Sequence, residues 1–217
     1  MPLSSFWFAA PAAVAVTYPT LNPESATDNA DMTLSEGNLR AATTVNNRTL
    51  TATMATGSSG GYYFEVKVIS YASGGGLYLG LTDTATHNDA NVFGAGKFVG
   101  FSSYAGTYDS TDSGSAASDT NDFSGTDVSS NDDVWQFALD ATNDKFWIGK
   151  NNTWADGTTP SIGGSGHTSL GVPSGALYPF ISRAGSYNET YQFNFGATDF
   201  AHTPPTGFAA LTSATKP

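Results

Sequence analysis

Three stretches of the chain, residues 62–69, 134–140 and 191–195, alternate between large apolar residues and other residues. A period of two predicts a β-strand with one buried face, because successive side chains point to opposite sides of a strand. We expect the apolar positions of these strands, and of the strand predicted after the second one, to form the core. The predicted core residues are Phe64, Val66, Val68, Trp135, Phe137, Leu139, Phe146, Ile148, Phe193 and Phe195.

Residues 134–157 predict a hairpin and carry three of the four tryptophans. The segment 141–144 supplies the turn between its two strands, and Asn151-Asn152 supplies a second turn before Trp154. Asn and Asp suit such turns because they tolerate a left-handed backbone and bond their own main chain.

The same hairpin resembles the signature of the SPRY domain family. The matching residues are Ala138-Leu139-Asp140, Asn143-Asp144-Lys145 and the run from Lys150 to Trp154. The family has glycine where this chain has Asp144 and Asn152. Both residue types still suit a turn with positive φ, so we expect the hairpin to be kept.

Four further stretches match the family in chain order: 62–66, 77–81, 177–182 and 191–196. The resemblance runs from about residue 61 to about residue 211. It implies an all-β fold, a bent antiparallel β-sandwich of the concanavalin A-like jelly-roll kind. A chain rich in Gly, Ser and Thr with 12% charged residues fits short strands joined by turns.

We predict three parts: an extended N-terminal arm over residues 1–30, the sandwich over 31–200 and a C-terminal arm over 201–217. Four prolines oppose regular structure in the first part. The apolar run 6–16 has no basic residue before it, so we interpret it as a docking arm rather than a secretory signal. No apolar run is long enough to predict a membrane span.

Phe6, Trp7 and Phe8 are three adjacent aromatic residues within this arm. They either pack on the domain's own surface or insert into a partner chain, because leaving such a run in water is costly. We predict these three as partner-binding residues.

The formal net charge of −11 disfavours binding to nucleic acid or to an anionic membrane. The absence of cysteine excludes disulfides and a thiol nucleophile.

Residues 107–133 read as an acidic loop of low complexity, for which a weak Ca²⁺ site is the alternative to a solvated loop. We otherwise expect no cofactor and no metal.

The resemblance implies that the chain binds protein partners through loops at one end of the sandwich, as members of the family do. Those loops would be 83–97, 107–131 and 155–175, with Tyr104, Tyr108 and Phe123 as partner-binding residues.

Catalytic chemistry finds little support in the residues. Glycoside hydrolysis needs two facing carboxylates, and Glu65 has no second carboxylate on its strand face. Lys67 beside it suggests a cross-strand ion pair instead. The three histidines fall in predicted loops, and Gly163–His167 only begins like a nucleophile elbow. We therefore predict that the protein is not an enzyme.

The opening residues 3–9 and the segment 200–208 resemble parts of tailed-phage structural proteins. We predict a bacteriophage virion protein, a binding module on a tail or head fibre. It would attach to other virion proteins through its arm, contact a host-surface protein or glycan through its loops, and form a homo-oligomer in the particle. A capsid decoration protein is the alternative, and a secreted lectin-like protein or glycoside hydrolase is the third.

Overall fold

The computed structural model describes residues 15–23, 32–44, 48–72, 76–84, 97–103, 106–112, 115–119, 123, 130–166, 171–183 and 187–215. Its strands are β1 (Met32–Ser35), β2 (Arg40–Thr43), β3 (Arg48–Thr51), β4 (Gly61–Ser70), β5 (Leu77–Thr82), β6 (Phe98–Ser102), β7 (Gly106–Asp112), β8 (Ser115–Asp119), β9 (Val134–Asp140), β10 (Lys145–Lys150), β11 (Thr153–Trp154), β12 (Tyr178–Arg183), β13 (Glu189–Asn194) and β14 (Phe208–Ala210). A short 3-10 helix, η2 (Ala155–Gly157), follows β11.

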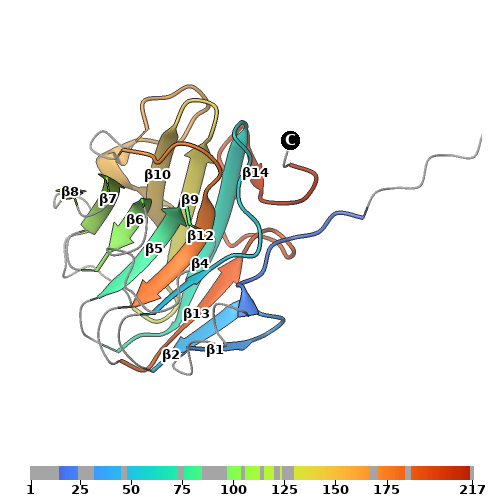
Figure 1. Ribbon diagram of the computed structural model, residues 1–217, viewed down its shortest axis with the longest axis vertical. Helices are drawn as coiled ribbons and strands as arrows, with labels where there is room; N and C mark the ends of the chain where they lie inside the picture. The colour runs from blue at the N-terminus through green and yellow to red at the C-terminus, as the bar shows by residue number, and fades with distance from the viewer. Residues whose placement is uncertain are drawn as a thin grey trace, which may run out of the picture.

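Two sheets form the sandwich (Figure 1). One has eight strands in the order β1-β2-β13-β4-β9-β10-β11, with β14 also paired to β4. The other has six strands in the order β3-β12-β5-β6-β7-β8. Among the described strands, all pairs are antiparallel except β14 with β4, which is parallel. The prediction of an all-β, antiparallel sandwich is confirmed.

The main core lies between the two sheets. All ten residues predicted for the core are buried in this cluster. Phe101 of β6 stacks on Trp135 of β9 with ring centroids 3.9 Å apart, which joins the two sheets. Within the eight-stranded sheet, Phe64 stacks on its cross-strand neighbour Phe137 at 4.8 Å.

The turns of the central hairpin have the predicted left-handed conformation. Asp144 has φ of 51°, Asn151 of 50° and Asn152 of 64°. The amide of Asn151 also closes the start of the hairpin, accepting the N–H of Val134 at 2.8 Å and donating to Asp133 at 2.7 Å. Asp and Asn therefore replace the family's glycines without changing the hairpin.

Residues 107–119, which we predicted as loop, instead contain most of a hairpin formed by β7 and β8. The segment is rich in Ser and Thr, a composition that we interpreted as a loop, but Thr also suits a strand. The prediction of a continuous loop was wrong for this part. Calcium binding there stays untested.

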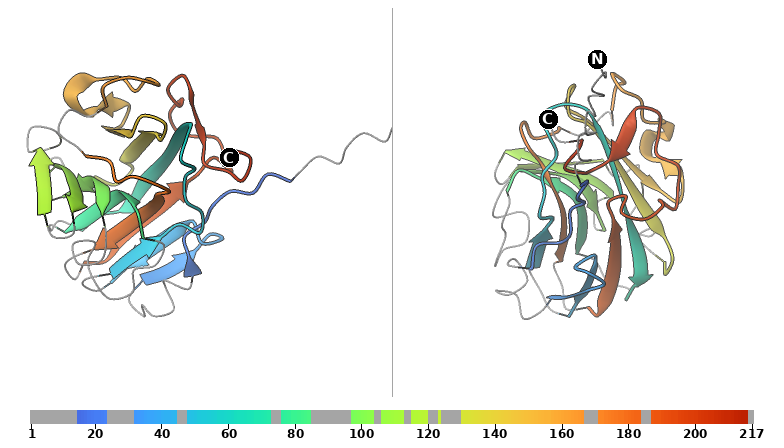
Figure 2. Two further views of the ribbon diagram at one scale, coloured as in Figure 1. Left: turned by 45° about the horizontal axis from the view of Figure 1, so that its top comes forward. Right: turned by 90° about the vertical axis from the view of Figure 1, so that its right-hand side faces the viewer.

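A second, smaller core covers the outer face of the eight-stranded sheet. Tyr63, Ala138 and Trp147 pack there against Phe208, with Phe200 beside them. The covering segment, residues 196–215, is called the C-terminal strap below. Its strand β14 pairs with β4, and the right-hand view of Figure 2 shows this red strand against the teal β4.

The strap also meets the beginning of the described chain. Thr17 and Ser213 exchange two hydrogen bonds of 3.0 and 2.9 Å. Leu21 and Leu211 both reach the main core. Within the described residues, no helix is long and apolar enough to cross a membrane.

Candidate binding groove and the buried polar sites

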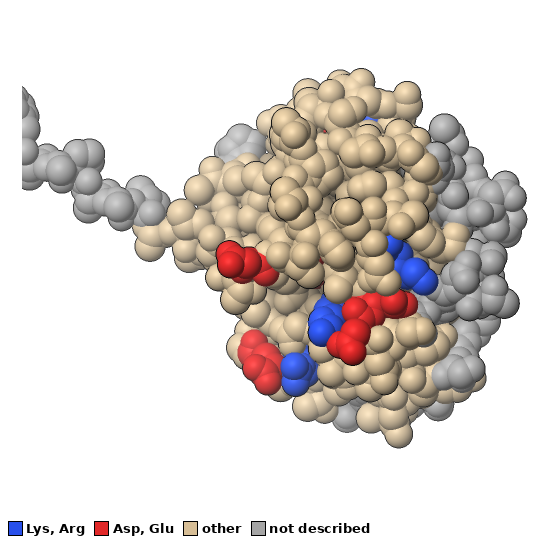
Figure 3. All heavy atoms as spheres, turned by 180° about the vertical axis from the view of Figure 1, so that it is seen from behind, with Lys and Arg blue, Asp and Glu red and all other residues tan. Residues whose placement is uncertain are grey.

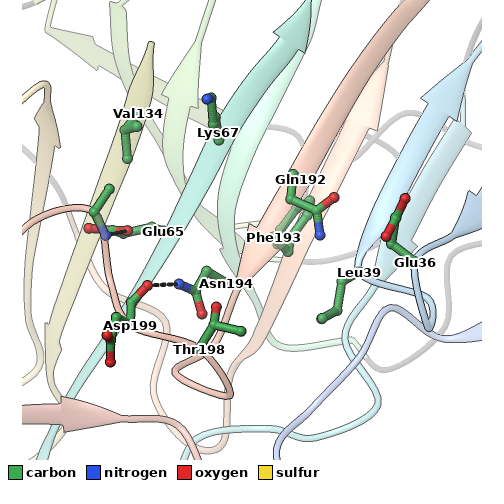
Figure 4. Close-up of a pocket in the computed structure, with 11 residues that line it drawn as sticks. Glu36, Leu39, Glu65, Lys67, Val134, Gln192, Phe193, Asn194, Thr198 and Asp199 are labelled. Carbon is green, nitrogen blue, oxygen red and sulfur yellow. Dashed lines mark hydrogen bonds between the residues drawn. The ribbon is translucent and has the colours of Figure 1, made fainter. Parts of the chain in front are cut away.

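A groove of about 380 Å³ opens on the outer face of the eight-stranded sheet (Figure 4). The β1–β2 turn bounds it on one side and the C-terminal strap on the other. Its lining residues are Glu36, Leu39, Glu65, Lys67, Val134, Gln192, Phe193, Asn194, Thr198, Asp199 and Ala201.

Strand register builds the floor of this groove. Gln192 of β13 lies opposite Lys67 of β4, and Lys67 lies opposite Val134 of β9. Arg40 of β2 extends the same row on the other side of Gln192. Because side chains alternate along a strand, this whole row points to the outer face. Gln192 and Asn194 are the polar positions of the alternating stretch 191–195. The alternation could have predicted that both side chains face outward, but we did not name them as site residues.

The two cations of the row are each held by a carboxylate. Lys67 Nζ lies 2.8 Å from Asp132 Oδ1, and an Arg40 guanidinium nitrogen lies 3.4 Å from Glu36 Oε1. Arg40 Nε also donates to Gln192 Oε1 at 3.0 Å. Figure 3 shows basic groups beside acidic groups near the centre of this face. The expected pair of Lys67 with Glu65 is not formed, because Glu65 is buried under the strap while Lys67 reaches solvent.

Glu65 fastens the strap. It is 2% exposed and accepts hydrogen bonds from the backbone N–H groups of Ala201 and His202 at 2.7 and 2.9 Å. The Tyr63 hydroxyl donates to the same carboxylate at 2.8 Å. Both carboxylate oxygens are thus engaged by donors of the folded chain, so Glu65 has a structural role here.

This network continues into the central hairpin. Gln136 donates to the Tyr63 hydroxyl at 3.0 Å and accepts the N–H of Asn152 at 2.6 Å. Burial, together with the neighbouring Glu65 carboxylate, raises the pKa of Tyr63 far above its ordinary value. A buried chain of hydrogen bonds therefore links the second hairpin turn to the strap.

Asp140, the acid of the family signature, caps the first hairpin turn. It accepts the N–H groups of Thr142, Asn143 and Gly163 at 3.1, 3.2 and 2.8 Å. The Asn143 amide adds a fourth bond at 2.7 Å. Burial alone would raise the pKa of Asp140, but these hydrogen bonds outweigh it and the pKa lies below its ordinary value.

A buried ion pair joins β12 to β13. Arg183 Nε lies 2.9 Å from Glu189 Oε2, and both side chains are fully buried. Tyr191 donates to the same carboxylate oxygen at 2.6 Å, and the Arg183 guanidinium lies over the Tyr187 ring. Burial raises the pKa of Glu189 despite the opposing effects of Tyr191 and Arg183. The only sequence signal was a basic residue ending one strand and an acid starting the next.

Of the predicted partner-binding residues, the structure describes the side chain of Phe123. The Phe123 ring packs edge-on against Trp135 at 5.3 Å, so the core covers part of it. Tyr108 belongs to β7, but its side chain lies outside what the structure describes. Tyr104 and the arm residues Phe6, Trp7 and Phe8 also lie outside the described residues.

Metal-ligating side chains do not gather in the described part of the chain, where no group of three His, Cys, Asp or Glu could hold an ion. His202 contributes its backbone N–H to Glu65. His87 and His167 lie outside the described residues.

Solved structures of similar fold are SPRY domains. The SPRY domain of human HERC1 matches with a TM-score of 0.55 and 15% identity, covering 82% of this chain and 99% of that domain. Another human SPRY domain matches with a TM-score of 0.53 and 14% identity, covering 77% of this chain and 97% of that one. No protein-family model and no curated protein matches the sequence. The likeness confirms the predicted resemblance at the level of fold: this sandwich has the fold of SPRY domains.

Proposed function

We propose that the protein is a non-catalytic module that binds other proteins. The observation that carries the proposal is a SPRY-like sandwich whose best-placed strand carboxylate, Glu65, is occupied by the N–H groups of the strap. The open groove beside it offers a surface for contact rather than a pair of reactive carboxylates.

We further propose that the module belongs to a bacteriophage particle. The support is the sequence resemblance of residues 3–9 and 200–208 to tailed-phage structural proteins. In this proposal the arm attaches to other virion proteins and the loops face the host surface. Capsid decoration by the same sandwich is the second candidate, supported by the same residues.

Binding through the predicted loop residue Tyr104 and through Tyr108, which lies in β7, is tested with intact protein carrying Tyr104→Ala and Tyr108→Ala together, measured on cells of the bacterial host by flow cytometry. We expect cell binding to fall at least about tenfold while the melting temperature is kept. The matched control is Ser58→Ala, an exposed change outside the three predicted binding loops. Equal binding by all three proteins would remove the loops from the proposal.

The position on the particle is tested by electron microscopy of purified particles labelled with an antibody against this protein. Label on fibres or tail supports the fibre proposal. Label spread over the shell supports capsid decoration, and particles without label would contradict both.

A further inference from the structure

The groove floor presents the cation of Lys67, and a second cation, Arg40, lies beside the lining residue Gln192 on the same row of the sheet. Lys67 and Arg40 flank Gln192 across three neighbouring strands, β4, β13 and β2. Their side chains are 45% and 35% exposed, although each contacts a carboxylate. Cations held in this way attract the negative face of an aromatic ring. Leu39, next to Arg40 in the chain, and Val134, at the Lys67 end of the row, also line the groove.

The charges of the groove argue against a strongly charged ligand. Glu36 and Asp132 already form ion pairs with the two cations, and the carboxylate of Glu65 already accepts a backbone N–H of the strap. Figure 4 shows the carboxylate of Asp199 directed away from Gln192 and Lys67. The surface therefore suits an uncharged segment rich in aromatic side chains.

Such a segment exists in the chain itself. Residues 1–14 contain no Asp, Glu, Lys or Arg side chain and include Phe6, Trp7 and Phe8. A groove of about 380 Å³ is within the size range of sites that enclose a small ligand, so it can receive one or two of these rings.

The described chain begins with residues that leave the sandwich. Residues 15–18 lead away from the sandwich (Figure 1), and Val16 and Tyr18 are 48% and 37% exposed. The hydrogen bonds of Thr17 with Ser213 fix this exit. Fourteen extended residues advance about 45 Å at about 3.3 Å each, which is enough to reach a neighbouring molecule.

We propose that the aromatic arm of one copy binds the groove of a second copy, with its rings over Lys67 and Arg40. The inference rests on the proposed role of the arm as an anchor and names its partner as another copy of this chain.

The test is photo-crosslinking in the full-length protein with a benzophenone amino acid in place of Phe8. Unlabelled chains carrying the probe are mixed with ¹⁵N-labelled chains without it, and crosslinked peptides are identified by mass spectrometry. We expect crosslinks from the probe to residues 36–40 or 192–201 of labelled chains. Crosslinks found only within one chain, or only to other surfaces, would overturn the proposal.

Two variants of the labelled chain sharpen the result. Thr198→Trp fills the groove from an exposed turn position and should lower the crosslink yield at least about tenfold. Lys67→Gln should lower it as well, because it removes a cation from the row. The control is Ile162→Trp, an exposed position outside the groove, which should leave the yield unchanged.

Each variant must melt like the parent. An unchanged yield with Thr198→Trp contradicts the proposal, and so does an equal loss with Ile162→Trp. Absence of crosslinks between copies would overturn binding between copies while leaving the proposed function intact, because the arm could then attach to a different virion protein. Loss of cell binding by the loop variants, in contrast, bears on the proposed function alone.

Discussion

At the scale of single residues, buried polar side chains decide the local structure of this sandwich. Asp140 ends β9 and receives four hydrogen bonds from the following turn and from the loop at Gly163. A buried acceptor with four donors is costly to replace, because each donor would be left without its partner. The family signature placed an acid at this position, but its bond to Gly163 depends on tertiary structure.

Asp140→Asn should lower the free energy of unfolding at neutral pH by about 1–3 kcal/mol. An amide nitrogen in place of Oδ2 cannot accept from Gly163 or from the Asn143 amide. The folded pKa lies below the unfolded one, so ionised Asp140 stabilises the fold above the ordinary Asp pKa. This stabilisation is lost as the pH falls through the folded pKa.

Urea titrations of the parent and of Asp140→Asn, from neutral pH to strongly acid pH, measure this effect. The difference between the two proteins should shrink as the pH falls. A difference that stays constant with pH would show that the charge of Asp140 is not what stabilises the turn.

At the scale of elements, the sequence predicted strands and turns well and their coverings poorly. The alternation of apolar and other residues identified β4, β9 and β13. Asp144 and Asn152 were predicted to suit turns with positive φ, and both residues have positive φ. Glu65 lay on the expected face of β4, but the strap that buries it comes from more than 130 residues along the chain. Periodicity carries no information about which distant segment covers a face.

Asn152→Gly should raise the free energy of unfolding slightly, by up to about 1 kcal/mol, because glycine adopts positive φ without the cost of a Cβ. The greater freedom of glycine in the unfolded chain limits the gain. The matched control is Thr153→Gly in β11, which should cost about 0.5–1 kcal/mol. Thermal melts of both variants check the prediction, and a clear loss of stability in Asn152→Gly would contradict it.

Glu65→Ala should loosen the strap and cost about 3 kcal/mol, because three donors lose their acceptor in a buried place. Hydrogen exchange at Ala201 and His202 should become faster, with little change in β9. The control is Lys67→Ala, whose exposed ion pair contributes less than about 1 kcal/mol. Unchanged exchange at the two amides would show that the strap is held by its aromatic contacts instead.

At the scale of the whole molecule, one aromatic core joins two sheets and a second one attaches the strap. The part of the first core that comes from the eight-stranded sheet was predictable, since the ten predicted residues recur at every second position along β4, β9 and β10 and at the end of β13. The second was not, because Phe200 and Phe208 come from a segment with little strand pattern. The groove could not be predicted from the sequence either, because it exists only where the strap crosses the sheet near the β1–β2 turn.

Phe137→Ala should destabilise the sandwich by about 3–5 kcal/mol, as deletion of a large buried ring usually does. Phe137 is fully buried and stacks on Phe64 and Phe146. Urea unfolding of the variant and of the exposed control Ser174→Ala gives the comparison. Equal midpoints would contradict the central place of this ring in the core.

We propose that the sandwich binds other proteins and does not catalyse, and that Glu65 is a structural acceptor. The measurement that tests this most directly is release of reducing sugar from a panel of polysaccharides by the intact protein. We predict no release above that of a buffer blank, for the parent and for Glu65→Gln alike. Release by the parent that Glu65→Gln abolishes, while the variant still melts as a folded protein, would contradict the proposed non-catalytic function.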